Sequence, residues 1–436
     1  MEAEAVAPWS GLPERLRVLR GTLACPHPTH RGFDILPDGV MAVDARGVIT
    51  DVGPAGAECT VPVTRPGAVW LPGFVDTHIH YPQTRVIGRA TGPLLEWLER
   101  TIFPEEARFV ERAYAEAVAE EFCGALSRWG TTTAAVYGSS DPGATEALFS
   151  AFARHGLRGL LGMTLMDCGA PSSVLVPATT ALAAAEDLIQ RWHGHDEGRL
   201  RYCVTPRFAL SCTSHLMKGA AALAQRHGLW LQTHVAESRA EIAAVAARFP
   251  EARDYLGLYA DHGMVGDRTL LAHCVWFDDA AWDAVASAGC AVSHCPDSNF
   301  FLGSGQMPLA APLSRGVRLG LGTDVGAGRS FSLRRIVASA YDTGVLTGAG
   351  CGAEPLLWLA TTGGACALGV GDTVGRLAPG YEADLVAIDL QDCEPRAGDG
   401  LFEALAFRHD AGPVAATYVR GRRVSQGSTP SLARED

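Results

Sequence analysis

The chain has 436 residues, a length that suits one large barrel accompanied by a small second domain. Hydrophobic residues make up 47% and charged residues 19%, so the chain can build a large core and is not disordered. The net charge of −12 disfavours a nucleic-acid polymer as partner, and no apolar run approaches the roughly 18 residues of a membrane-spanning helix.

Three further features of the sequence bear on export and on the kinds of site that the chain can form. The N-terminus, MEAEAVAPWS, is acidic where a signal peptide carries positive charge, which predicts an unexported, cytoplasmic protein. The 12 cysteines are scattered without a C-x-x-C, so we expect buried thiols, and the zinc deaminases that use P-C-x-x-C are excluded. The only lysine, Lys218, is predicted to lie in the first turn of a helix. A P-loop is therefore absent, and a metal-bridging lysine is not expected at a strand end.

The predicted elements change in character along the chain. Residues 15–25 and 40–53 alternate between apolar and polar side chains with turn residues between them, which predicts short antiparallel strands. From residue 68 onward, β-branched apolar runs alternate with amphipathic segments that end in glycine, such as 111–130 and 214–228, which predict helices. The eight strands expected in this region are 68–80, 131–139, 158–166, 200–210, 229–237, 269–277, 289–298 and 318–324. Alternating segments return at residues 375–390 and 415–424.

This order of elements predicts an α/β protein with two domains. Eight strands that alternate with helices are typical of a (β/α)8 TIM barrel. A doubly wound sheet also alternates, but polar residues at most of the strand ends favour the closed barrel. We expect the flanking strands from both termini to meet in one small β-sandwich. The predicted domains are residues 68–377 for the barrel, and residues 1–67 with 378–436 for the discontinuous sandwich.

Histidines and an aspartate stand at the ends of four predicted barrel strands. His78 and His80 are two residues apart in the first strand, so both point to the same side. The other three residues of this kind are His234, His273 and Asp324. Because barrel enzymes build their sites at the carboxyl ends of the strands, these side chains are expected to bind one metal ion. Imidazoles with a carboxylate suit Zn²⁺ with a position left for water, although Fe²⁺ or Mn²⁺ fits the same ligand types.

Glu237 follows His234 by three residues, just beyond a predicted strand end. A metal lowers the pKa of bound water from 15.7 to about 7, yet a nearby group must still accept the proton and pass it on. We expect Glu237 to be this proton carrier.

The motifs around these residues resemble those of the guanine deaminases in the amidohydrolase superfamily. The histidine and aspartate set indicates only the superfamily, whereas YPQ after His80 and TPRF in the fourth strand are more specific. The likeness spans nearly the whole barrel and reaches the predicted sandwich. The segments that carry it are LPGFVDTHIHYPQT (71–84), LLEWLERTIFPEE (94–106), VTPRFALSC (204–212), QTHVAES (232–238), LLAHC (270–274), HCPDSNFFLGSG (294–305), GLGTDVGAG (320–328) and PGYEADLVAID (379–389).

The resemblance implies hydrolytic deamination of guanine to xanthine and ammonia by a zinc-activated water, with one ion per subunit. It assigns the metal to His78, His80, His234 and Asp324. It gives His273 the task of holding the water or the substrate, Glu237 the proton shuttle, and Asp324 the role of a second base. It places the purine base against Gln83, Arg207 and Phe208, beside His234, Glu237, His273 and Asp324. It also implies a homodimer and a cover over the ligand that contains Trp97.

Three alternatives remain open from the sequence. The nearest is a sister aminohydrolase acting on another ring, such as 8-oxoguanine, a pterin, a triazine or an adenosine derivative. The second is a metal-free binding or scaffold protein on the same barrel. The third is an amide hydrolase with two metal ions, which would need the bridging lysine that this chain does not offer. His294 ends the seventh predicted strand, and no role is assigned to it.

Overall fold

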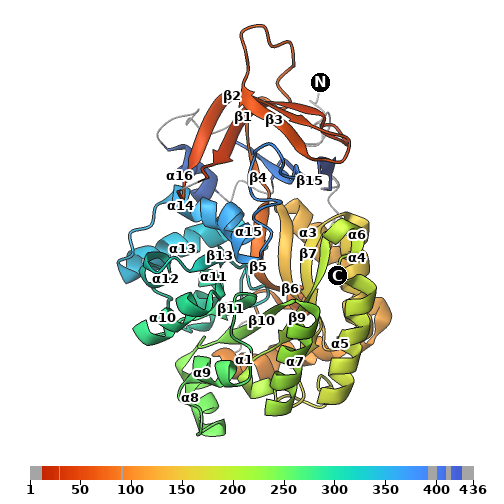
Figure 1. The fold of residues 1–436 in the computed structure, drawn as a ribbon, viewed down its shortest axis with the longest axis vertical. Coiled ribbons are helices and arrows are strands. Elements are labelled where there is room, and N and C mark those ends of the chain that lie inside the picture. The colour runs from red at the N-terminus through yellow and green to blue at the C-terminus, as the bar shows by residue number, and fades with distance from the viewer. Residues whose placement is uncertain (1–11, 29, 90–91, 391–399, 409–413, 425–436) are drawn as a thin grey trace, which may run out of the picture.

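The chain folds into a barrel of parallel strands and a separate sheet that is built from both of its ends (Figure 1). The computed structural model describes residues 12–28, 30–89, 92–390, 400–408 and 414–424. The acidic N-terminal decapeptide and Cys393 lie outside the described residues. The cysteines within these ranges are free thiols. Six of them are buried as expected, whereas Cys25, Cys59, Cys168, Cys351 and Cys366 are partly exposed.

Eight strands run parallel around the barrel, and each pairs with the next in chain order. The barrel strands are β5 (Phe74–His80), β6 (Thr131–Tyr137), β7 (Arg158–Gly162), β9 (Leu200–Pro206), β10 (Trp230–Val235), β11 (Thr269–His273), β12 (Ala291–His294) and β13 (Arg318–Leu321). A short strand, β8 (Thr164–Leu165), extends the pairing with β9. The segment after β13 meets β5, where the Asp324 amide donates to the His78 carbonyl and the His80 amide donates to the Val325 carbonyl. The predicted (β/α)8 architecture is therefore confirmed.

Helices between the strands cover the outside of the barrel (Figure 1). The ends of α7 (Ser214–His227) show the usual capping interactions. The Thr213 side chain caps its start by accepting from the Leu216 amide, and Gly228 ends it in a left-handed conformation. None of the described helices is both long and apolar enough to cross a membrane. The helices after β6 are α4 (Pro142–His155), α5 (Ala178–Trp192), α6 (His195–Gly198), α7 (Ser214–His227), α8 (Arg239–Arg248), α9 (Tyr255–Asp261), α10 (Asp279–Ala288), α11 (Pro296–Leu302), α12 (Ala310–Ser314), α13 (Leu333–Thr347), α14 (Ala353–Trp358), α15 (Gly364–Ala367) and α16 (Leu401–Phe407).

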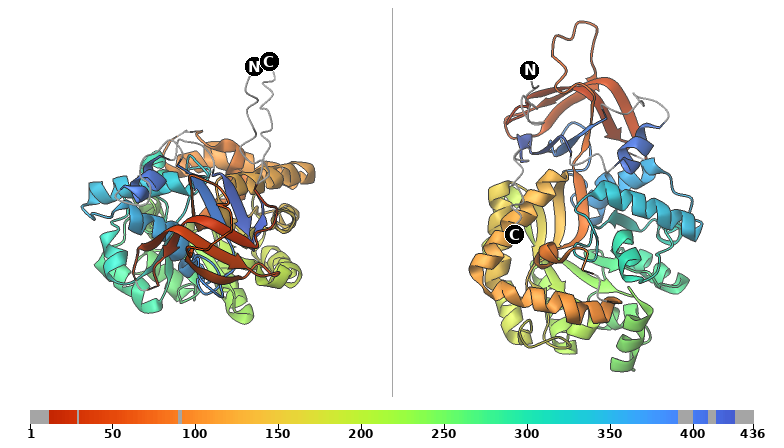
Figure 2. Two further views of the ribbon diagram at one scale, coloured as in Figure 1. Left: turned by 90° about the horizontal axis from the view of Figure 1, so that it is seen from above. Right: turned by 180° about the vertical axis from the view of Figure 1, so that it is seen from behind.

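The second sheet has seven strands in the order β16-β15-β14-β4-β1-β2-β3, and it lies over one end of the barrel (Figure 2). Its strands are β1 (Val18–Pro26), β2 (Phe33–Val43), β3 (Ile49–Pro54), β4 (Ala68–Pro72), β14 (Leu385–Asp389), β15 (Ala416–Val419) and β16 (Arg422–Arg423). The prediction of one strand over 68–80 is wrong, because that stretch is two strands, β4 and β5. They separate at Gly73, where a Cβ atom would lie 2.2 Å from the Thr132 hydroxyl oxygen.

Strand β4 connects this sheet to the barrel, because its side chains point alternately into the two hydrophobic cores. Trp70 packs into the core of the terminal sheet, whereas its neighbours Val69 and Leu71 pack into the core of the barrel. The domain limits at residues 67 and 378 stay a prediction. The pairing of β4 with β1 and β14 favours placing the first limit after Pro72 instead.

The chain between β5 and α3 (Arg112–Arg128) contains a run of short helical turns. They are η1 (Tyr81–Val86), α1 (Leu94–Trp97), η2 (Leu98–Ile102), α2 (Phe103–Glu106) and η3 (Ala107–Val110). Because this run starts at the carboxyl end of β5, it lies at the same end of the barrel as His80, and its apolar side chains form a cluster with Phe208.

Candidate metal centre and substrate pocket

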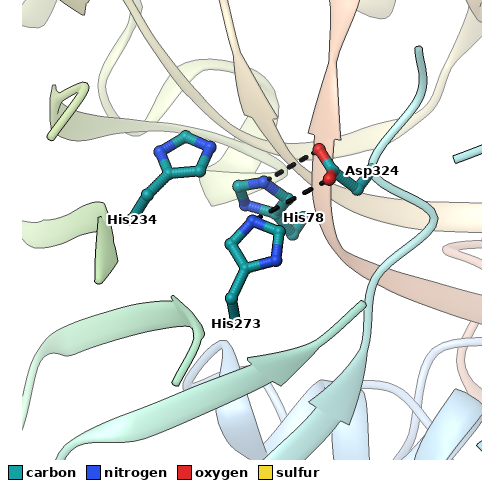
Figure 3. A group of neighbouring side chains, drawn as sticks. All are labelled: His78, His234, His273 and Asp324. Atoms are coloured by element: carbon teal, nitrogen blue, oxygen red, sulfur yellow. Dashed lines mark ion pairs between the residues drawn. The ribbon is translucent and has the colours of Figure 1, made fainter. Parts of the chain in front are cut away.

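Four separated segments bring side chains together at the carboxyl ends of the barrel strands (Figure 3). His78 and His80 come from β5, and His234 from β10. His273 ends β11, and Asp324 follows β13. One ligand atom from each of His78, His234, His273 and Asp324 lies within 4.8 Å of the others.

His80 also belongs to this cluster. Its Nε2 atom lies 3.2 Å from His78 Nε2 and 3.1 Å from His234 Nε2. Asp324 Oδ1 is 3.2 Å from His78 Nε2 and 3.3 Å from His80 Nε2. Ligand atoms about 2.1 Å from a tetrahedral metal lie roughly 3.4 Å from one another. These four residues therefore have the spacing of ligands around one ion.

His273 stands slightly apart from that set. Its Nε2 is 3.8 Å from Asp324 Oδ2 and 3.5 Å from Glu237 Oε2. Its Nδ1 lies 3.1 Å from Asn299 Oδ1, and a proton on Nδ1 completes this hydrogen bond and leaves Nε2 as an acceptor. This Nε2 is buried without a hydrogen-bond partner among the described residues. It can therefore receive a hydrogen bond from a water molecule or a ligand in the cavity.

Burial and neighbouring side chains favour the protonation states that bind a metal, namely neutral imidazoles and an ionised carboxylate. Burial lowers the pKa of His80 to about 3 and holds the pKa of His234 well below its usual range, so both imidazoles are neutral at pH 7. Burial alone would raise the pKa of Asp324, but the adjacent His78 and His80 outweigh it and keep this carboxylate ionised. His234 Nδ1 is 2.7 Å from the Arg207 carbonyl, which orients the ring and leaves Nε2 for the cluster.

The backbone at this site adopts left-handed conformations that non-glycine residues rarely use. The φ angle is +73° at His273, +50° at Asp324 and +51° at Ala236. Each such residue costs free energy and persists only where the surroundings impose it. His273 and Asp324 belong to the cluster and Ala236 directly precedes Glu237, so the fold imposes these backbone conformations at the site.

Glu237 lies directly after β10 and is fixed by a capping box at the start of α8. Ser238 accepts from the Glu241 amide, and the Glu241 carboxylate accepts from the amides of Glu237 and Ser238. The Ser304 hydroxyl donates to Glu237 Oε1 at 3.1 Å, so the second carboxylate oxygen stays near His273. Burial, with a smaller contribution from the charge of Asp324, raises the pKa of Glu237 to about 8. The side chain can therefore take up and release a proton near neutral pH.

A cavity opens beside these groups. Gln83, Arg207 and Phe208 line it, as the resemblance implied, and Trp97 contributes to its wall. The remaining lining residues are His80, Leu94, Leu98, His234, Glu237, Glu241, His273, Leu302, Asp324 and Ala327. The segment after β5 therefore covers the cavity with apolar side chains.

Some residues at the site were not predicted from the sequence. Glu106 forms an ion pair with Arg207, a residue that lines the cavity. Asp76 accepts from the His78 amide and from Thr323, and it could have been noticed because it is two residues before His78 on the same strand. Glu241 could have been noticed as the fourth residue of an S-x-x-E capping motif. Glu106 carries no such local signal.

Two other candidates lie away from the chemistry. Both ring nitrogens of His294 are buried without partners among the described residues, and His294 does not line the cavity. Lys218 is exposed on α7, a helix outside the barrel, as predicted, although it lies just beyond the first turn of that helix. A lysine that bridges two metal ions is therefore not present at the described strand ends.

The contribution of Glu237 to the stability of the metal-free protein is expected to fall as pH rises from about 5 to 8. The pKa of Glu237 is about 8 in the fold, above its value in the unfolded chain, so the folded state binds more protons in this range and loses stability when they leave. Glu237→Gln removes that loss. The variant should therefore exceed the wild type by a few kcal/mol at pH 8 and match it near pH 4, since one unit of pKa is worth about 1.4 kcal/mol. Urea unfolding of chelator-treated protein measures this difference, and an equal difference at both pH values would contradict it.

Comparisons with known proteins agree with this geometry. The amidohydrolase family matches residues 69–424. The chain is 38% identical over 444 residues to a probable guanine deaminase of Deinococcus radiodurans, covering 96% of this chain and 99% of that one. Its structure is similar to that of E. coli guanine deaminase, with a TM-score of 0.88, 33% identity and coverage of 95% and 100%. It is also similar to C. acetobutylicum guanine deaminase with bound guanine in the active site, with a TM-score of 0.87, 27% identity and coverage of 93% and 99%. The chain therefore belongs to the amidohydrolase family and, within it, to the guanine deaminases.

Proposed function

We propose that this chain catalyses the hydrolytic deamination of guanine to xanthine and ammonia. The proposal rests on one observation. The cluster of possible metal ligands and the carboxyl group of Glu237 lie at the same cavity as the side chains of Arg207, Gln83 and Phe208. The relatives named as guanine deaminases, one of them with guanine bound, support it. A metal-free scaffold would not need buried ligands with this spacing.

The metal is proposed to be Zn²⁺, held by His78, His80, His234 and Asp324. Three neutral imidazoles and one carboxylate are a donor set that suits this ion, and the spacing of 3.1 to 3.3 Å between His80 Nε2 and each other ligand atom fits it. When bound, the ion supplies Lewis-acid activation of a water molecule.

Glu237 is proposed to move the protons of the reaction. Its carboxylate accepts a proton from water as the water oxygen bonds to carbon 2 of the base, and it passes that proton to the adjacent ring nitrogen. Asp324 is proposed to orient the water, and the Nε2 atom of His273 accepts a hydrogen bond from it. Glu237 then delivers the water's second proton to the amino group, the carbon–nitrogen bond breaks, and ammonia leaves.

Arg207, Gln83 and Phe208 are proposed to select the base. Guanine has a ring carbonyl that can accept from the Arg207 guanidinium and the Gln83 amide, while Phe208 offers a flat apolar surface for the ring. Adenine has an amino group at the corresponding position, which would leave buried donors unpaired. A pocket built in this way rejects such analogues strongly.

Incubation of the zinc-loaded protein with a panel of heterocycles tests the proposal. Guanine is expected to yield xanthine, followed by ultraviolet absorbance, and one equivalent of ammonia. Its kcat/KM should exceed that of adenine, which lacks the ring carbonyl, by at least ~100-fold, the scale on which a pocket discriminates by hydrogen bonding. It should also exceed the values for 8-oxoguanine, a pterin and a triazine. Absence of xanthine, or a preference for another ring, would overturn the assignment.

A homodimer is proposed for this enzyme on the basis of the family resemblance. Val345 and Leu346 of α13, which are 63% and 68% exposed, offer an apolar surface on which a second copy could pack.

A further inference from the structure

Glu106 connects the two polar side chains that the proposed function assigns to the purine carbonyl. It is the last residue of α2, and its side chain is 8% exposed. Its Oε2 accepts from Arg207 Nη1 at 2.6 Å, and its Oε1 accepts from Gln83 Nε2 at 3.2 Å. One carboxylate therefore holds both side chains through a different oxygen.

The surroundings leave these side chains little freedom. Gln83 Oε1 accepts from the Gly326 amide at 3.1 Å, so the amide group of Gln83 has one orientation and one N–H left for a ligand. Met166 Sδ is 3.6 Å from Arg207 Nη1, and the Phe103 ring centre is 5.4 Å from the guanidinium carbon. Phe103 and Glu106 are the two ends of α2. This short helix therefore fixes the position of Arg207.

The ion pair between Arg207 and Glu106 also determines whether the pocket favours a neutral or an anionic ligand. Arg207 is 3% exposed, and a buried guanidinium without a partner would favour an anion. Paired with Glu106, it can donate hydrogen bonds while the pair carries no net charge. Guanine is a neutral base, whereas xanthine has a second ring carbonyl and loses a ring proton more readily.

We propose that Glu106 is a positioning and specificity-determining residue. It aligns Arg207 and Gln83 and cancels the charge of Arg207, so that the pocket favours the neutral substrate over the anionic form of the product. This inference rests on the proposed deamination of guanine.

The test compares Glu106→Gln with Glu105→Gln. Glu105 is the matched control because it is adjacent and 6% exposed, but its carboxylate accepts from Tyr114 and Arg108 instead of the pocket residues. Each variant is purified with metal, its thermal unfolding is measured, and steady-state kinetics give kcat, KM for guanine and the inhibition constant for xanthine.

Glu106→Gln is expected to lower kcat/KM for guanine by at least ~10-fold, because a buried ion pair loses one partner. The ratio of the xanthine inhibition constant to the guanine KM should also fall by at least ~10-fold, since the unpaired guanidinium attracts an anion. Glu106→Asp should restore part of this ratio, and Glu105→Gln should leave it unchanged. A merely structural role would reduce the active fraction, and hence kcat, without moving either constant.

The proposal is overturned if Glu106→Gln keeps the wild-type ratio, or if Glu105→Gln changes it equally. Failure of the underlying function is a separate result, because wild-type protein would then produce no xanthine from guanine. In that event, xanthine and guanine binding to both variants, measured by calorimetry, still reports whether Glu106 sets the preference for a neutral base. Equal preferences in wild type and Glu106→Gln would again overturn it.

Discussion

Replacing Glu237 by glutamine is expected to reduce kcat for guanine by at least ~100-fold while the metal content stays at the wild-type level. Glutamine keeps the shape of the side chain and can still accept from the Ser304 hydroxyl, which lies 3.1 Å from Glu237 Oε1. It cannot, however, take up and release a proton. Single-turnover kinetics with metal analysis of the same preparation measure both quantities.

Ser304→Ala is the graded control for that experiment. It removes one hydrogen bond to Glu237 and leaves the carboxylate in place, so a decrease of only about 5-fold is expected from a loss near 1 kcal/mol. Near-normal turnover by Glu237→Gln would remove Glu237 from the proton transfer. Loss of metal from that variant would instead show that the carboxylate helps to hold the ion.

Replacing His80 by alanine is expected to remove the metal and to lower kcat/KM by at least ~1,000-fold, since the water would no longer be activated at neutral pH. His273→Asn is expected to keep the metal and lose turnover. The reason is that His273 Nε2 is 3.8 Å from Asp324 Oδ2, whereas His80 Nε2 lies between 3.1 and 3.3 Å from three ligand atoms. Metal content after dialysis, together with kcat/KM, distinguishes the two variants.

His215→Ala provides the control for these substitutions, because His215 is exposed on the outer helix α7 and should affect neither quantity. Metal retention by His80→Ala combined with metal loss by His273→Asn would exchange the roles of the two histidines. The cluster of His78, His234, His273 and Asp324 would then be the ligand set.

The strands could be predicted from the sequence because their burial leaves a pattern within a short stretch of chain. Each of the eight barrel strands lies within one of the predicted apolar runs, because a strand buried on both faces requires a continuous apolar run. The prediction was wrong at residues 68–80, because β4 and β5 are both apolar runs and only Pro72-Gly73, a dipeptide typical of turns, separates them. The close approach of Thr132 explains why a glycine is needed there, and that contact comes from a strand about 60 residues later in the chain.

The sequence by itself determined the barrel order and the set of strand-end side chains, because alternation along a strand and the common direction of parallel strands place His78, His80, His234, His273 and Asp324 at one rim. Only the tertiary structure decided which of these atoms are 3.1 to 3.3 Å apart, and that Glu106 contacts Arg207 across 101 residues of chain. The path of the segment after β5 depends on packing against the barrel as a whole. Such long-range contacts follow from the complete fold and leave no periodic pattern in the residues that make them.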